Sequence, residues 1–404
     1  MPIRIRVGDE AGYARHLAQK TRVGRPDLAI GFEPTRAAAP ALFVEGAEFY
    51  PPMLDDLRAA TSSIHINEFG IRPGVVADRF TKVLKEKAAA GLPVRLIVDA
   101  RGSRPDGESR ELFADLAASG VEVYVNRPFD LRVALGPLGA ETGKRLNLEN
   151  LFAVDHRKFF VIDGRVGWVG TAGIEDRFED GRHHDLFVRM EGPIVHQLQT
   201  VFLASYRWHG GEYGLSEIAC LYPEPEEGDV PALTLQNAPG SYRPISRAIL
   251  RHIERAERTL DIMNPYISHP VIFERLIDAA WRGVRVRIVA PPNHRTWTTG
   301  YVRLYHHEAL TGAGVELWTY PAVAHAKAFI RDGEHVLVGS CNLETWSLRR
   351  FFELDVSIRS PELAREFADE LFDPDIAASV PATGIEGLQD RLLATAFYLA
   401  SPFL

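Results

Sequence analysis

Short apolar strands alternate with amphipathic helical stretches along most of the chain, and the same order of elements occurs twice. In the first copy, the strands and their connecting helix fall on Arg58–Ile71, residues 76–91, Val94–Val98 and Ser119–Val125. In the second copy, the equivalent segments are Arg255–Ile267, residues 270–283, Val284–Val289 and Ala313–Tyr320. Each helix ends at a glycine, Gly91 or Gly283, which suits the residue that closes a helix. The repeat predicts two halves built to one plan.

Strands and helices that alternate in this order indicate right-handed βαβ crossovers. We therefore predict an α/β fold of two similar domains, each with a mixed, mostly parallel sheet flanked by helices. Residues Arg127–Phe152 have no counterpart in the second half and predict an inserted surface loop, and the proline- and acid-rich stretch Leu221–Pro231 predicts a linker. The expected division is an N-terminal extension at 1–40, domains at 41–218 and 232–375 joined by a linker at 219–231, and a C-terminal amphipathic helix at 376–404.

Composition narrows the class of protein. The chain has 404 residues, 46 basic and 54 acidic, and a net charge of −8. This charge argues against broad, sequence-independent nucleic-acid binding, so no nucleic-acid partner is expected. Two cysteines, Cys220 and Cys341, form no disulfide framework, which favours a reducing compartment. The N-terminus has no apolar signal region, and no window reaches the roughly 18 apolar residues of a membrane span. We expect a cytoplasmic protein that can also bind the inner face of the membrane peripherally.

The chemistry is carried by a short motif, His-x-Lys-x-x-x-x-Asp, that follows the third strand of each half. The two copies are His156, Lys158 and Asp163, and His325, Lys327 and Asp332. One copy of so short a pattern would be weak evidence for an active site, but two copies at equivalent places in the two halves are strong evidence. On a strand, His and Lys two residues apart share a face.

An Asp-Gly pair ends each motif and predicts a hairpin. The returning strand leads to Thr171 in the first half and to Ser340 and Asn342 in the second, which we expect to bind a substrate phosphate. These three residues could instead cap the following helices. Likewise, Asp163 and Asp332 are placed with the catalytic set, although an Asp before Gly is also common for turn reasons alone.

Two carboxylates begin the next strands, Asp185 in the first half and Glu353 in the second. They are the natural partners for the far nitrogen of each histidine and would fix its tautomer. Paired histidines and lysines suit phosphodiester displacement, in which one imidazole attacks phosphorus and the other protonates the leaving oxygen. Because the lysines can stabilise the equatorial oxygens, neither a metal ion nor another cofactor is expected.

The doubled motif resembles the phospholipase D superfamily, whose members carry two such HKD motifs, and the phrases around it are similar to cardiolipin synthase-like proteins. The resemblance spans roughly Leu42–Phe372. It implies two α/β domains packed as a pseudo-twofold pair, with both motifs in one cleft, His156 as nucleophile and His325 as acid and base. The first half departs from the family pattern at Gly173, where Asn is usual, at Thr171, which replaces a Ser or Gly, and at Asp185, which occupies the acid position. In the second half, Trp346 stands where Arg is usual and Phe351 where Asn is frequent.

The resemblance implies an enzyme that cleaves a glycerophospholipid phosphodiester through a phosphohistidine and transfers the phosphatidyl group to an alcohol or water. The alternatives are a phosphodiesterase or nuclease of the same superfamily and a non-catalytic lipid-binding scaffold. The apolar side of the C-terminal helix, which includes Leu388, Leu392 and Leu399, fits either packing on the domains or contact with a membrane surface. The neighbouring pairs His183/His184 and His306/His307 point in different directions and predict no metal site.

Overall fold

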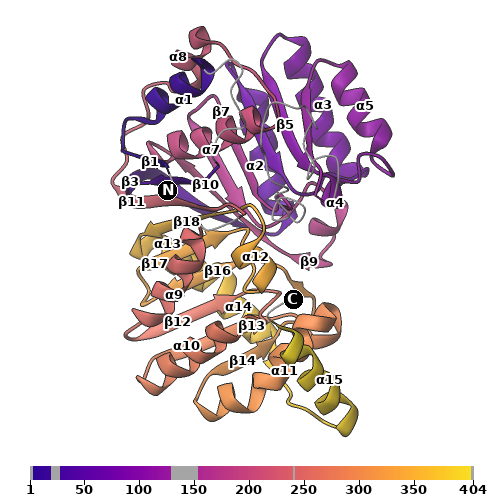
Figure 1. Cartoon of the computed structure of the whole chain (residues 1–404), viewed down its shortest axis with the longest axis vertical. Coiled ribbons are helices and arrows are strands. Elements are labelled where there is room, and N and C mark those ends of the chain that lie inside the picture. Colours follow the sequence, from indigo (N-terminus) through magenta and orange to yellow (C-terminus); the bar gives the residue numbers. More distant parts are fainter. Residues whose placement is uncertain (1–2, 20–27, 129–152, 240–241, 402–404) are drawn as a thin grey trace, which may run out of the picture.

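The computed structural model describes residues 3–19, 28–128, 153–239 and 242–401 (Figure 1). The predicted insertion Arg127–Phe152 therefore lies almost wholly outside the described residues. The strands are β1 (Ile3–Ile5), β2 (Ile30–Phe32), β3 (Thr35–Val44), β4 (Ile64–Glu68), β5 (Val94–Asp99), β6 (Glu122–Asn126), β7 (Lys158–Ile162), β8 (Val166–Gly170), β9 (His183–His184), β10 (Leu186–Glu191), β11 (Val230–Asn237), β12 (Thr259–Met263), β13 (Arg285–Ala290), β14 (Glu316–Thr319), β15 (Val323–Ala324), β16 (Ala328–Arg331), β17 (His335–Gly339), β18 (Glu353–Arg359) and β19 (Val380–Pro381).

The helices are α1 (Glu10–Gln19), α2 (Gly46–Ala59), α3 (Val75–Ala89), α4 (Ala100–Ser103), α5 (Arg110–Ala118), α7 (Ile194–Trp208), α8 (Ile218–Leu221), α9 (Pro244–Glu254), α10 (Pro270–Trp281), α11 (Trp297–Gly312), α12 (Thr345–Arg349), α13 (Pro361–Glu366), α14 (Asp373–Ala378) and α15 (Leu388–Ala400). The sequence predicted α3 and α10 within a residue of their observed starts. Gly91 and Gly283 follow these helices at φ values of 89° and 90°, where a glycine avoids the strain of a side chain.

Both halves contribute to one 15-stranded sheet, in the order β19-β14-β13-β12-β16-β17-β18-β11-β3-β10-β8-β7-β4-β5-β6. The prediction of two similar α/β domains is confirmed, because each half contains the same run of strands with helices packed on it. The expectation of a mostly parallel sheet is wrong. Only β4-β5-β6 and β12-β13-β14 are parallel, and the other neighbours in the sheet are antiparallel. After the third parallel strand, the chain returns through hairpins, and hairpins produce antiparallel neighbours.

The two halves are joined edge to edge through β3 and β11. β3 pairs with β10 of the first half on one side and with β11 on the other, and β11 pairs with β18 of the second half. β3 begins at Thr35, inside the segment expected to be an extension, and β11 begins at Val230, inside the expected linker. The predicted extension and linker therefore contribute β3 and β11, the two strands that form the seam where the halves meet in Figure 1.

One of the hydrophobic cores spans this seam. It contains α7 residues such as Leu198 and Phe202 together with second-half residues such as Val338, Val356 and Phe367, all fully or almost fully buried. Each half also has a separate core on the other side of its sheet. The motif-strand aromatics Phe159, Phe160, Trp168 and Phe329 are buried, as predicted.

The two hairpins are held by the motif aspartates. Asp163 and Asp332 have φ values of 55° and 57°, and the glycines that follow are also in the left-handed region, as a tight hairpin turn requires. The Asp163 carboxylate accepts hydrogen bonds from the backbone N–H groups of Thr61, Ser62 and Ser63 at 2.8–2.9 Å. The Asp332 carboxylate accepts the equivalent bonds from residues 257–259. Each aspartate thus fastens its hairpin to the start of the first parallel strand of its half, β4 or β12.

The C-terminal helix α15 packs along α11 at the edge of the second half (Figure 1). At its end, the Thr345 hydroxyl of α12 donates a hydrogen bond to the carbonyl of Ser401 at 3.0 Å. Three of its leucines remain outside this contact: Leu388, Leu392 and Leu399 are 74%, 63% and 70% exposed. No helix in the described part of the chain is both long enough and apolar enough to cross a bilayer.

Replacing Asp163 with alanine should lower the free energy of unfolding by about 1–3 kcal/mol, because three backbone N–H groups lose their acceptor. Asp55→Ala is a matched control, since Asp55 pairs only with Arg58 on the exposed face of α2 and should change stability by less than about 0.5 kcal/mol. Urea unfolding of both variants measures the difference. Equal stability of the two variants would contradict the anchoring role.

Candidate active site

A pocket of about 850 Å³ opens between the two halves, and both motif histidines line it. The first half contributes Phe69, Arg72, Arg101, Gly102, Val154, His156, Arg177 and His183, and the second half contributes Tyr266, Thr298, Thr299, His325, Asn342, Glu344, Trp346 and Phe351. The two motifs, far apart in sequence, are thus brought to one cavity. The walls combine cationic groups with aromatic rings, which suits a ligand that has both a phosphate and an apolar part.

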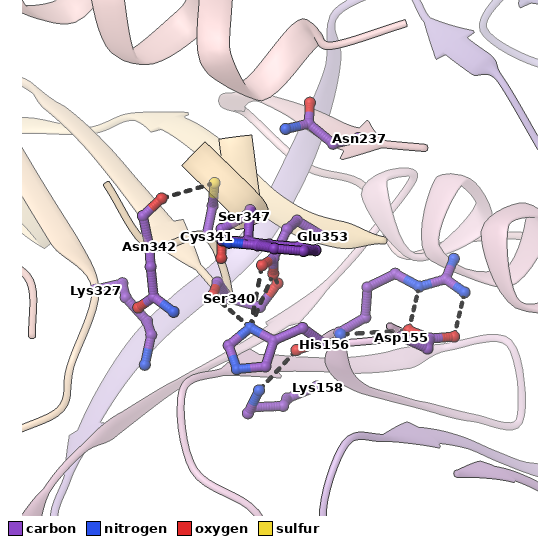
Figure 2. Close-up of polar contacts among 12 residues, drawn as sticks. Asp155, His156, Lys158, Asn237, Lys327, Ser340, Cys341, Asn342, Ser347 and Glu353 are labelled. Atoms are coloured by element: carbon purple, nitrogen blue, oxygen red, sulfur yellow. Dashed lines mark hydrogen bonds and ion pairs between the residues drawn. The ribbon is translucent and has the colours of Figure 1, made fainter. Parts of the chain in front are cut away.

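His156 lies just before β7 and is oriented by the second half of the chain (Figure 2). Its Nδ1 atom is 3.1 Å from each carboxylate oxygen of Glu353 and 3.1 Å from the carbonyl oxygen of Ser340. These acceptors favour a proton on Nδ1, which leaves the Nε2 lone pair for chemistry. In Figure 2, Lys158, Lys327 and Asn342 gather around the same imidazole.

His325 lies just before β16 and is oriented by the first half. Its Nδ1 atom is 2.7 Å from Oδ1 of Asp185, and its backbone N–H donates to the carbonyl of His184 at 2.8 Å. The short strands β9 and β15 pair immediately beside this contact. Each catalytic candidate therefore takes its carboxylate from the opposite half of the chain, an exchange that the local sequence could not reveal.

The motif lysines fold back onto their own histidines. Lys158 Nζ donates to the carbonyl oxygen of His156 at 2.6 Å, and Lys327 Nζ donates to that of His325 at 2.7 Å. Lys327 Nζ also lies 3.0 Å from Nε2 of His325. Both lysines are almost completely buried, and burial lowers the pKa of Lys327 to about 7 and lowers that of Lys158 as well.

Burial also sets the charge of the two histidines. It is the main reason that the pKa of His156 falls well below its ordinary value, and the nearby Lys158 and Lys327 act in the same direction. Burial lowers the pKa of His325 to about 3, even though Asp185 opposes the shift. Both imidazoles are therefore neutral in the empty pocket at neutral pH.

The hydroxyl groups of Thr171 and Ser340, expected from the sequence to bind phosphate, donate instead to the two orienting carboxylates. Thr171 Oγ1 donates to Asp185 at 2.7 Å, and Ser340 Oγ donates to Glu353. Both residues are fully buried behind these carboxylates. The two hydroxyls hold the orienting carboxylates, and they do so in equivalent ways in the two halves. They do not cap helices either: the side chain of Glu344 caps α12, and the short 3-10 helix Asp176–Phe178 that follows Thr171 has no side-chain cap.

Asn342 is the one residue of the expected phosphate set that lines the pocket. Its Oδ1 atom is buried and has no hydrogen-bond partner among the described residues. In the first half the equivalent position is Gly173, where an added Cβ atom would lie 2.6 Å from the carbonyl oxygen of Gly70. A larger residue would require the backbone to shift, so the first half has no side chain that matches Asn342.

Asp163 and Asp332 do not line the pocket. Their carboxylates are taken up by the backbone N–H groups of the hairpin anchors. This placement corrects their assignment to the catalytic set in favour of the turn role that the Asp-Gly pairs also predicted.

Sequence reasoning missed several pocket residues. The ring of Phe69 packs against His156 with centroids 4.8 Å apart, and Lys158 Nζ lies 5.0 Å from the centre of the same ring. Arg72 and Arg177 share the carboxylate of Glu175. Phe69 and Arg101 follow the carboxyl ends of the parallel strands β4 and β5, which is where α/β sheets bind ligands, so their positions could have identified them.

Trp346 and Phe351, the two second-half residues that differ from the family pattern, also line the pocket. Trp346 and Phe351 pack against each other with ring centroids 6.1 Å apart, and Phe351 lies 6.2 Å from the ring of His156. The polar side chains usual at these positions are thus replaced by an aromatic wall beside a reactive imidazole. The wall extends to α12, which contacts the end of α15.

Comparison with known proteins agrees with the doubled motif. The family model described as "Cardiolipin synthase, PLD-like domain" matches residues 53–206 and 249–373. A cardiolipin synthase of Listeria monocytogenes serotype 4b (strain CLIP80459) is 29% identical over 356 residues, which cover 85% of this chain and 70% of that protein. The major cardiolipin synthase ClsA of Bacillus subtilis (strain 168) is 27% identical over 380 residues, which cover 90% and 75%.

Solved structures share the fold. The crystal structure of phosphatidylserine synthase from Haemophilus influenzae Rd KW20 superposes with a TM-score of 0.68 at 13% identity, covering 98% of this chain and 100% of that one. Polyphosphate kinase from Porphyromonas gingivalis superposes with a TM-score of 0.55 at 14% identity, covering 89% and 52%. At these identities the likeness concerns the fold alone. Together with the family match, it confirms the expected superfamily and the doubled domain.

The titration of Lys327 should control anion binding. Sulfate keeps its charge across the range, so its Kd should be lowest below pH 7 and rise by up to about tenfold per pH unit above it, as the lysine with a pKa of about 7 loses its proton. Calorimetry between pH 5.5 and 8.5 measures this. Lys327→Met should bind weakly with little pH dependence, and a flat profile in the unaltered protein would contradict the assignment.

Proposed function

The chain belongs to the cardiolipin synthase family of phospholipase D-like proteins, and from this we propose that it is a phosphatidyltransferase that moves the phosphatidyl group of a glycerophospholipid to an alcohol. The observation that best supports the proposal is the pair of buried, neutral imidazoles in one pocket. Each has its Nδ1 atom held by a carboxylate, and Nε2 of His325 lies 3.0 Å from the Lys327 ammonium, which places a phosphate-binding charge beside that imidazole. Two lysines beside them match the charge of a phosphodiester.

In the first step, Nε2 of His156 attacks phosphorus, the P–N bond forms and the P–O bond to the leaving alcohol breaks. His325 gives its proton to the departing oxygen and becomes neutral. In the second step, His325 removes the proton of an incoming alcohol, whose oxygen attacks phosphorus and releases His156. Lys158, Lys327 and Asn342 stabilise the equatorial oxygens in both steps.

The substrate itself helps to charge the acid. His325 is neutral in the empty pocket because burial disfavours its charged form. A bound phosphodiester brings a negative charge next to the imidazole, and a nearby opposite charge raises the pKa of a histidine. Protonation of His325 is therefore coupled to substrate binding.

The aromatic wall favours an organic acceptor over water. Phe69 and Phe351 pack beside His156, Trp346 packs on Phe351, and all three rings line the pocket with apolar surface. An acceptor alcohol that carries a glycerol backbone gains from covering this surface, whereas a water molecule does not. We therefore propose transfer as the main reaction and hydrolysis as a side reaction.

We further propose that α15 rests on the membrane surface. Leu388, Leu392 and Leu399 form one exposed apolar stripe, and the helix adjoins α11 and α12, which both contribute residues to the pocket. The stripe thus begins near the pocket rim and runs outward. Its only charged residues are Asp390 and Arg391, so contact would depend on apolar insertion and not on anionic lipids.

Burst kinetics with phosphatidyl-p-nitrophenol should separate the two histidines. p-Nitrophenolate leaves without a proton, so His325→Ala should release about one equivalent per site and then stall, because no base activates the acceptor. His156→Ala should give no burst, because the nucleophile is missing. Stopped-flow absorbance measures both. The reverse pattern would exchange the two roles, and full turnover in both variants would contradict the mechanism.

Replacing Leu388, Leu392 and Leu399 together with serine should weaken binding to phosphatidylcholine vesicles by about tenfold to a hundredfold, because three exposed leucines lose their apolar contact. Trp281→Ser is the control, since Trp281 is equally exposed at the far end of α10. Vesicle sedimentation measures the partition at low and high salt. Binding that survives the triple substitution, or that vanishes in high salt, would contradict insertion of this stripe.

A further inference from the structure

His184 lies at the boundary between the two halves, within a pair of carboxylates. Its Nδ1 atom contacts the carboxylate of Glu45, which directly precedes α2 in the first half. Its Nε2 atom lies 2.8 Å from Oδ2 of Asp375 in α14 of the second half. The ring of Tyr320 packs beside the imidazole with centroids 4.9 Å apart. The side chains of His184 and Asp375 are each only 6% exposed, whereas that of Glu45 is 36% exposed, so the Asp375 side of this ionic bridge is shielded from solvent.

His184 differs in charge from the two motif histidines, because it is protonated and they are neutral. Burial alone would lower the pKa of His184, but Asp375 and Glu45 outweigh it and raise the pKa to about 10. His184 is therefore a fixed cation at neutral pH, when His156 and His325 are neutral. A buried charge of this kind is stable only with its partners in place, so removing either carboxylate should be costly.

The backbone around His184 connects this bridge to the reactive pocket. The carbonyl of His184 accepts hydrogen bonds from the N–H groups of His325 at 2.8 Å and Ala326 at 2.9 Å. The N–H of Glu45 donates to the carbonyl of Asp185 at 2.9 Å, and Glu45 adopts a φ of 68°, which is unusual for a residue with a side chain. The next residue, Asp185, holds Nδ1 of His325.

In the second half, the residue equivalent to His184 is Phe352, and no ion bridge is seen at it among the described residues. Phe352 precedes Glu353 as His184 precedes Asp185, and its carbonyl accepts the N–H of His156 at 3.0 Å. The Phe352 ring packs against the guanidinium of Arg157, which is paired with Asp155 inside the same half. Among the described residues, the segment that orients His325 is thus held by an ion bridge between the halves at His184, whereas the equivalent Phe352 makes a ring contact with a paired arginine.

We propose that His184 is a positioning residue, a buried cation whose bridge to Glu45 and Asp375 holds the His184–Asp185 segment so that Asp185 aligns His325 for proton transfer. The proposal rests on the proposed function, in which His325 protonates the leaving alcohol. An error of about 1 Å in such an alignment costs on the order of a hundredfold in rate. The cost should fall on the proton-transfer step and not on substrate binding.

The test compares two leaving groups in His184→Gln. With phosphatidylglycerol, whose glycerol must be protonated as it leaves, kcat should fall by about tenfold to a hundredfold while KM changes little. With phosphatidyl-p-nitrophenol, the rate of the first burst should fall by less than about threefold, because this leaving group needs no proton. Phe352→Leu is the matched control, since it disturbs the alignment of the nucleophile His156 and should slow both substrates alike.

A uniform loss of rate with both substrates in His184→Gln would show a merely structural role and overturn the proposal. If His184→Gln does not fold, Asp375→Asn decides by the same ratio, because it keeps an acceptor for His184 and removes only the charge. His325→Ala is the reference variant, since it shows how much each substrate slows when the proton donor is removed. If His325→Ala shows the selective loss but the His184 and Asp375 variants do not, only the positioning role fails. If His325→Ala slows both substrates equally, the proposed acid role of His325 fails and the positioning role fails with it.

Discussion

The exchange of carboxylates between the two halves is the constraint on which the rest of the structure depends. Glu353 orients His156, and Asp185 orients His325, so neither half contains a complete pair of histidine and carboxylate. A hydrogen bond of about 3 Å tolerates little displacement, and the two halves must therefore be held rigidly. The continuous sheet through β3 and β11 and the core around α7 provide this rigidity. They explain why segments resembling an extension and a linker are built into the sheet.

The sequence predicted the features that depend on local pattern. The repeated strands and helices, the two Asp-Gly hairpins and the His/Lys pairs could be found because periodicity, turn chemistry and spacing act over a few residues. The sheet seam could not, because β3 pairs with strands about 150 and 190 residues further along the chain, and nothing in its own residues specifies those partners. The roles of Thr171 and Ser340 could not be predicted from local sequence either. A hydroxyl near a motif can face a substrate or support a carboxylate, and only the rotamer in the folded chain decides between them.

The two similar halves differ at the residues that line the pocket and at those that hold the motif histidines in place. Asn342 has no partner at Gly173, because the backbone of Gly70 occupies the space. His184 is part of a buried ion bridge, whereas the equivalent Phe352 packs on a paired arginine. The core strands and hairpins, in contrast, remain alike. A pseudo-twofold scaffold with unlike supports suits a reaction that needs a nucleophile on one side and a proton donor on the other.

The long spacing of these contacts also bears on how the protein matures. The bond between His156 and Glu353 joins residues 197 positions apart, and that between His325 and Asp185 joins residues 140 apart. During synthesis on the ribosome, the first half emerges and can fold while Glu353, which orients His156, and His325, which Asp185 orients, are still missing. Contacts of such high sequence separation close late, because the loop entropy must be overcome first. The two imidazoles therefore both have their orienting carboxylates only after residue 353 has been made and the two halves have paired.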